Sequence, residues 1–76
     1  MATFDTLRTL LEQGSDVVLT GGLPHDKIIL LAEAAQRSGA KLTVSASTAS
    51  DFLINLSRRF GKTVAFVNGI DDLKKN

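Results

Sequence analysis

Apolar and polar positions follow one another along the chain in three similar blocks. Each block has a helix-like stretch, then a glycine, then a short apolar run that ends in turn residues: GSDVVLTGG at 14–22, GAKLTVSAS at 39–47 and GKTVAFVNG at 61–69. Gly14, Gly39 and Gly61 stand where a left-handed residue often follows a helix C-terminus. The pattern predicts three successive helix–strand units and a short C-terminal helical tail.

The helix-like stretches have the spacing of amphipathic helices. Phe4, Leu7, Leu10 and Leu11 fall on one face of the first stretch, and polar residues fill the other. We expect the second helix to begin near Pro24, because a first-turn proline lacks only an N–H that has no intrahelical partner there. It continues through HDKIILLAEAAQRS, and the third helix begins near Ser50 or Asp51.

The three apolar runs differ in a way that bears on the sheet. Residues 17–19 and 64–67 are continuously apolar, which is typical of strands covered on both faces. Residues 41–46 alternate between apolar and polar positions, which is typical of a strand with one face in water. Because a helix separates successive strands, the strands are expected to be parallel and joined by right-handed crossovers.

Two strand orders agree with this α/β pattern. In the order 1-2-3 all helices lie on one side of the sheet, whereas in the order 2-1-3 the first strand is central and the second is at an edge. The apolar first strand and the half-polar second strand favour 2-1-3, the flavodoxin-like arrangement, over 1-2-3. The sequence therefore predicts a small three-stranded parallel sheet within one α/β domain over residues 1–76.

Composition limits the kinds of site that the chain can form. It has 76 residues, no cysteine and one histidine, so disulfides, thiolate metal sites and His-pair zinc spacing are excluded, and we assign no metal and no cofactor. The net charge of +1 gives no basic excess, and we expect no nucleic-acid partner. No apolar run approaches the roughly 20 residues that span a bilayer. With no secretory signal recognised at its start, the chain is expected to be soluble and cytoplasmic, without a membrane partner.

Small hydroxyl residues and glycines collect where the strands end. A parallel sheet brings these ends to one edge, where α/β proteins commonly bind ligands. The candidate ligand-binding residues are Thr20, Gly21, Gly22, His25, Ser45, Ser47 and Thr48. Helix capping is the competing explanation, because Thr48 and Asp51 form a loose capping box before the third helix. The phosphate motifs G-x-x-x-x-G-K-[ST] and G-x-G-x-x-G are absent, which disfavours a conventional nucleotide site.

A catalytic function would depend on His25, the only side chain whose ordinary titration lies near neutral pH. No nucleophile, metal or third group can be assigned to it from spacing. We therefore assign no catalytic residue and interpret the chain as non-catalytic.

Three large aliphatic residues are out of place on the helices. At about 100° per residue, Leu30 falls within the polar face of the second helix and Ile29 at its margin, while Ile54 falls among polar residues of the third. Scattered exposed aliphatics are ordinary, but a cluster of them marks a contact surface. A 1-2-3 strand order would make these two helices neighbours and the three residues one patch, whereas 2-1-3 would divide them. Ile29, Leu30 and Ile54 are the candidate partner contacts, with homodimer formation as one form of contact.

The progression from LLEQGSDVVLTGG through a helix to SGAKLTVSAS resembles the helix–strand layout of anti-sigma-factor-antagonist (STAS) domains, over roughly residues 10–60. In such domains a loop containing an acidic residue, serine and glycine is phosphorylated, and this chain has GGLPHD at that place. The leading strands of those domains have no counterpart here. The resemblance thus implies a layout and a regulatory type of function, without the phosphorylated serine.

The expected function is that of a small regulatory or adaptor module that acts through protein–protein contacts. The alternative is binding of a small ligand or anion at the C-terminal edge of the parallel sheet.

Overall fold

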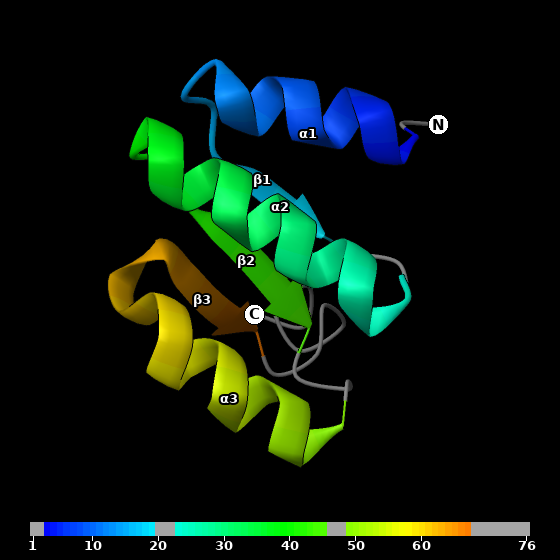
Figure 1. Cartoon of the computed structure of the whole chain (residues 1–76), viewed down its shortest axis with the longest axis vertical. Coiled ribbons are helices and arrows are strands. Elements are labelled where there is room, and N and C mark those ends of the chain that lie inside the picture. Colours follow the sequence, from blue (N-terminus) through cyan, green and yellow to red (C-terminus); the bar gives the residue numbers. More distant parts are fainter. Residues whose placement is uncertain (1–2, 20–22, 46–48, 68–76) are drawn as a thin grey trace, which may run out of the picture.

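The chain folds as a mixed α/β structure, seen here in a computed structural model that describes residues 3–19, 23–45 and 49–67. The elements in order are α1 (Phe4–Glu12), β1 (Val17–Leu19), α2 (His25–Ser38), β2 (Leu42–Ser45), α3 (Ser50–Phe60), a 3-10 turn η1 (Gly61–Thr63) and β3 (Val64–Val67) (Figure 1). The predicted parallel three-stranded sheet is confirmed. The predicted C-terminal helical tail lies outside the described residues.

The strand order is β1-β2-β3, so the preference for 2-1-3 is wrong. Val17 pairs with Leu42, which pairs in turn with Val64, and β2 is the central strand. The polar positions of β2 mark a strand whose second face is uncovered, and they do not mark an edge. The continuous apolar run of β1 does not indicate cover on both faces either, because Val18 is 56% exposed.

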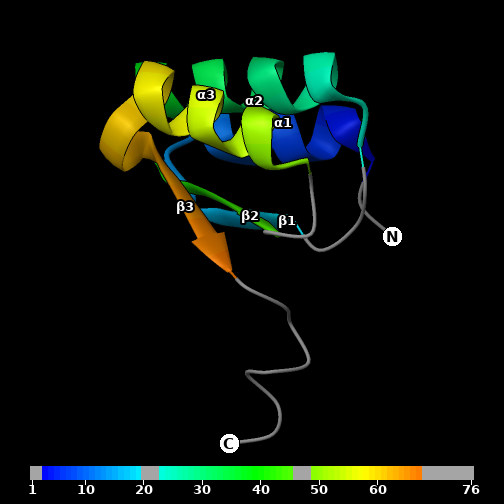
Figure 2. The same cartoon turned by 90° about the horizontal axis from the view of Figure 1, so that it is seen from below.

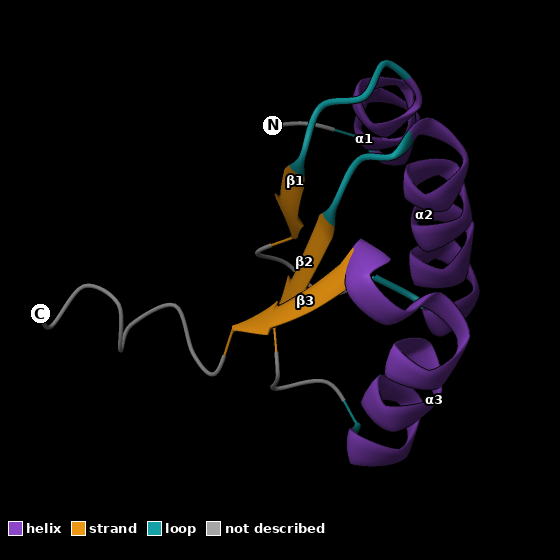
Figure 3. Cartoon of the chain, turned by 90° about the vertical axis from the view of Figure 1, so that its left-hand side faces the viewer, coloured by secondary structure: helices purple, strands orange, loops and turns teal. Residues whose placement is uncertain are grey.

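All three helices pack on one face of the sheet (Figure 2). Successive right-handed crossovers that step in the same direction across a sheet place their helices on the same side, which is what the order β1-β2-β3 requires. Viewed from the side, the helices form one layer and the strands form a second layer next to it (Figure 3). The second face of the sheet is therefore not covered by any described element.

The core lies between the helical layer and the sheet. Leu42 and Val44 of β2 are 0% and 1% exposed, and Leu11, Leu31 and Leu56 reach them from the three helices with at most 1% exposed. These residues belong to one cluster of buried apolar side chains, without a buried polar side chain in the described part of the chain. Each Å² of apolar surface that is buried contributes about 25 cal/mol to the stability of the fold. The interface between the helices and the sheet is therefore the main stabilising contribution.

The predicted left-handed conformation after the first two helices is confirmed. Gly14 has φ of 91° and Gly39 has φ of 81°. After α1, the Ser15 N–H donates to the Leu10 carbonyl and the Gly14 N–H donates to the Leu11 carbonyl, each at 3.0 Å. This pair of hydrogen bonds is the Schellman motif, which turns the chain from the helix toward the next strand.

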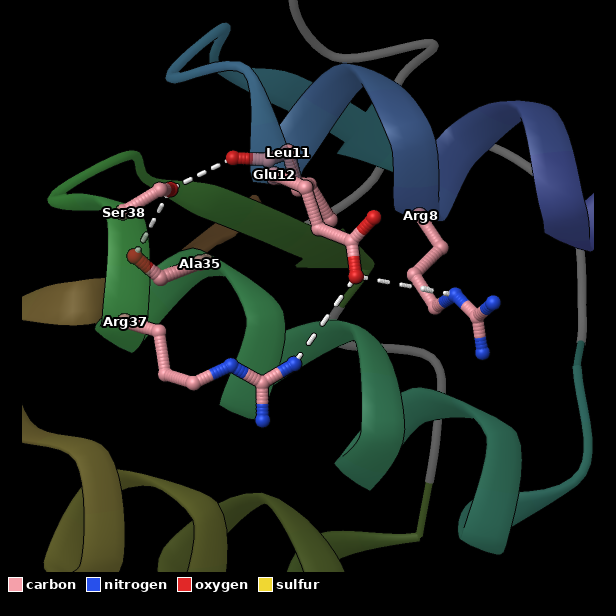
Figure 4. A network of polar contacts seen from close by, with 6 residues as sticks. All are labelled: Arg8, Leu11, Glu12, Ala35, Arg37 and Ser38. Carbon is pink, nitrogen blue, oxygen red and sulfur yellow. Dashed lines mark hydrogen bonds and ion pairs between the residues drawn. The ribbon is translucent and has the colours of Figure 1, made fainter.

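Polar contacts join the C-terminal ends of α1 and α2 (Figure 4). The Ser38 hydroxyl donates to the Leu11 carbonyl across the two helices. Glu12 Oε2 lies 3.9 Å from Arg37 Nη2 and 3.9 Å from Arg8 Nε. These contacts fix which side of α2 faces α1, and this orientation determines where the candidate contact residues lie.

Candidate functional site

The C-terminal ends of the three strands lie along one edge of the sheet. The register places Leu19 of β1 beside Val44 of β2, and Val44 beside Phe66 of β3. Of the predicted ligand-binding residues, the described part of the chain includes His25 and Ser45. The other five, Thr20, Gly21, Gly22, Ser47 and Thr48, lie outside the described residues. Ligand binding at this edge stays a prediction.

Among the described residues, none caps the N-terminus of α2 or α3 with its side chain. The N-cap residues are Pro24 and Ala49, whose side chains contain no hydrogen-bond acceptor. In α1, by contrast, the Thr6 N–H donates to Thr3 Oγ1 at 3.3 Å. The capping interpretation places Thr48 at the N-cap of α3, and the structure has Ala49 there instead. Thr48 itself lies outside the described residues, so the capping interpretation stays a prediction.

His25 has a structural contact that spacing along the sequence does not reveal. Its ring stacks on the ring of Phe52, with the centroids 3.9 Å apart and the planes inclined by 6°. The contact joins the first turns of α2 and α3. The His25 side chain has no hydrogen-bond or ion-pair partner among the residues that the structure describes. The ring is thus placed to hold two helices together, and no contact here prepares it for proton transfer.

A hollow of about 280 Å³ lies between α2 and α3. Its lining consists of Ile29, Phe52, Asn55, Leu56, Arg58 and Arg59. Ile29 and Phe52 are half-buried and pack on the core, and Leu56 is 1% exposed. Arg59 Nη2 approaches Glu33 Oε2 of α2 to 3.6 Å. The hollow thus has an apolar floor and a charged rim.

Leu30 and Ile54 flank the hollow and do not meet over it. They are 42% and 55% exposed. Leu30 lies about 20° around α2 from Arg37, at 100° per residue, and Arg37 contacts Glu12 of α1. Ile54 lies about 140° around α3 from Arg59, which reaches toward α2. Leu30 is therefore turned toward α1 and Ile54 away from α2, so the two are separate apolar points on either side of the hollow, which Ile29 lines.

We define the outer helical face as the surface of α2 and α3 turned away from the sheet. Its charges are separated along the helix direction. Asp26 and Asp51 lie in the first turns of the two helices, whereas Arg37, Arg58 and Arg59 lie in the last turns. The two helices run in the same direction (Figure 1). The outer helical face therefore has an acidic end and a basic end.

The sheet presents a second surface, which the sequence interpretation did not identify. We define the open sheet face by Val18, Thr43, Ser45, Ala65 and Val67. These positions alternate with the core residues along each strand. Val18 is exposed and the other four are half-buried. The alternation in residues 41–46 indicates an uncovered face on β2. With the strand order 1-2-3, the same face is uncovered on all three strands.

The residues of the hollow were also missed, except for Ile29. Helical periodicity alone places Phe52 and Leu56 on the core side of the third helix, and Arg58 and Arg59 at its solvated end. Each interpretation is correct for an isolated helix. The apolar and the charged residues line one hollow only because α3 packs beside α2.

Two further features are absent from the described part of the chain. No helix there is long and apolar enough to cross a membrane. No group of three or more His, Asp or Glu side chains there is arranged to hold a metal ion.

Comparison with known proteins gave no match to a protein-family model, a curated protein or a solved structure. The likeness to anti-sigma-factor-antagonist domains therefore remains a likeness of layout.

Proposed function

We propose that this chain is a non-catalytic module that acts through protein–protein contacts, and that the outer helical face is its contact surface. The observation that carries the proposal is the presence of two exposed aliphatic side chains, Leu30 and Ile54, on either side of the hollow between α2 and α3. Protein interfaces commonly combine such apolar anchors with a charged rim.

The physical support is the free energy available from covering these side chains. Full burial of a Leu or Ile side chain is worth about 1.5–3 kcal/mol. Leu30 and Ile54 are already about half-covered in the isolated chain, at 42% and 55% exposed. Contact with a partner would therefore contribute the part of this free energy that belongs to the surface still exposed. The half-buried floor residues Ile29 and Phe52 would add to this if a partner side chain entered the hollow.

A catalytic interpretation has less support. It would depend on His25, and one face of that ring is occupied by Phe52. Contact with a partner requires no catalytic group. It also explains why the large aliphatic side chains of Leu30 and Ile54 are exposed.

Site-specific photo-crosslinking tests the proposal. The full chain, with a photoreactive amino acid at position 30 or 54, would be irradiated in an extract of the cells that produce it. We expect crosslinks from both positions, either to another protein or to a second copy of the chain. We expect none from position 10, a matched control on α1 where Leu10 is 37% exposed. Crosslinking that is equal at all three positions, or absent from all, would contradict the proposal.

Ligand binding at the C-terminal edge of the sheet is the second candidate. It is favoured by the two N-cap residues, Pro24 and Ala49, because neither has a side-chain acceptor for the first N–H groups of α2 and α3. Titration with inorganic phosphate and nucleotides should then shift the amide signals of His25 and Ser45 and leave that of Leu30 unchanged. If no signal moves at millimolar concentrations, this candidate is rejected.

A further inference from the structure

We propose that the partner of the outer helical face is a second copy of this chain, packed so that α3 of one copy lies antiparallel to α3 of the other. The inference rests on the proposed function and goes further by naming the occupant and its orientation. It depends on the arrangement of charge on the face, on the position of its apolar residues and on its size.

The charge arrangement makes the face complementary to itself. Asp51 lies in the first turn of α3, and Arg58 in the last. A twofold axis that lies in the plane of the interface and is perpendicular to α3 reverses the helix direction in the second copy, and so places Asp51 of each copy near Arg58 of the other. Two copies stacked in the same direction would instead place like charges together, which costs free energy. Antiparallel packing is thus the only face-to-face arrangement of α3 that pairs its charges.

Neither charge is satisfied within its own helix. Seven residues separate Asp51 from Arg58, which corresponds to about 10.5 Å along the axis. Neither residue forms an ion pair in the described part of the chain, whereas Arg59 contacts Glu33 and Arg37 contacts Glu12. Asp51 and Arg58 are therefore an acid and a base on one helix that a partner can use without breaking an ion pair among the described residues, and Asp26 of α2 is a second such acid.

The apolar residues lie close to where the axis would cross. Ile54 is midway between Asp51 and Arg58, so the same axis that pairs these charges brings Ile54 near its own counterpart. Leu30 is near the middle of α2, which spans His25–Ser38. Self-pairing of a residue near the axis is characteristic of a twofold interface. Along the helix direction, Leu30 and Ile54 are thus near the middle, and Asp51 and Arg58 are near the two ends of α3.

The size of the face indicates how strongly two copies would associate. Two helices of 14 and 11 residues, about 10 Å apart, have a flat projection of roughly 400 Å², and the relief of the side chains adds accessible area to it. Stable interfaces cover about 800 Å² on each partner. The three strands project only about 150–200 Å². The outer helical face is therefore suited to a weak, concentration-dependent dimer, and the open sheet face is too small for one.

Sedimentation equilibrium of the full chain at several concentrations tests the proposal, using charge reversals at Asp51 and Arg58. We expect the unmodified chain to self-associate reversibly. Asp51→Arg and Arg58→Asp should each weaken the dimer about tenfold, because every like-charge contact occurs twice in a twofold dimer. The double variant D51R/R58D should regain the original association within about threefold, as should an equimolar mixture of the two single variants.

Restored association in the double variant cannot result from a more stable α3. Each reversal places a charge unfavourably against the helix dipole, and the double variant contains both of these penalties. Thermal unfolding of each variant checks the fold. If a variant does not fold, the salt dependence of the unmodified chain still decides, because raising the salt from about 50 mM to about 500 mM should weaken a charge-paired dimer several-fold.

Three results would overturn the inference. A chain that is monomeric at every concentration has no second copy as partner, and crosslinks from position 54 to a different protein would then leave the proposed function standing. Association that the double variant and the mixture fail to restore excludes the antiparallel arrangement. Association that is lost in Val18→Asp but unaffected by the charge reversals places the interface on the open sheet face.

Discussion

The outer helical face and the open sheet face both have exposed apolar side chains, but they differ in charge and size. The helical face sets Leu30 and Ile54 among acidic and basic residues that are separated along the helices. The sheet face sets Val18 beside half-buried hydroxyl and small apolar residues, without a charged side chain among the five that define it. Exposure alone therefore does not distinguish a contact surface, whereas the arrangement of charge around the exposed residues does.

The largest effect should come from the sheet residue that supports both faces. Leu42 is 0% exposed at the centre of the core. Leu42→Ala is expected to lower the free energy of unfolding by about 2–5 kcal/mol, through lost burial and a cavity. Val18→Ala on the other side of the sheet should change it by about 0.5 kcal/mol or less. Urea unfolding measures both. Equal losses would mean that the two sides of the sheet are equally covered, contrary to the structure.

A smaller effect is expected when charge is introduced on the two faces. Leu30→Asp should weaken self-association at least about tenfold, or 1.4 kcal/mol, because it places a carboxylate where an apolar contact forms. Val18→Asp should leave association unchanged. Neither should unfold the chain, since both positions are exposed. The sedimentation profiles of the two variants give the comparison, and an unchanged profile for Leu30→Asp together with a changed one for Val18→Asp would reverse the assignment of the faces.

The smallest effect concerns the ring contact that joins α2 to α3 and so shapes the helical face. A double-mutant cycle with His25→Ala and Phe52→Leu should give a coupling energy of about 0.5–1.5 kcal/mol for the stacked pair. The cycle removes the difference in helix propensity between histidine and alanine, which a single variant would include. Urea unfolding of the four proteins provides the values. A coupling energy of zero would show that the stacking does not hold the helices together.

The elements of the fold could be predicted because each depends on local pattern. The glycines after α1 and α2 adopt the left-handed conformation that their positions indicate. Helical periodicity places Leu30 and Ile54 among polar positions, and both are exposed. Such features require only the neighbouring residues of one helix or one turn.

The strand order could not be predicted because it depends on which strand lies beside which. The apolar run of β1 suits a central strand, but it also suits an edge strand whose outer side chain, Val18, remains in water. The alternation in β2 suits an edge strand, but it equally suits a central strand with one uncovered face. Three short strands contain too few positions to separate these cases. The hollow between α2 and α3 follows from the order, so it was missed as well.

The most direct test is the solvent accessibility of methyl groups on the two faces, measured by relaxation enhancement from a soluble gadolinium chelate at low and high protein concentration. Val18, Leu30 and Ile54 all have methyl groups and are all exposed in the single chain. The expected result is that Leu30 and Ile54 become shielded at high concentration while Val18 does not. Shielding of Val18 alone, or self-association without shielding of Leu30 and Ile54, would contradict the assignment of the outer helical face as the contact surface.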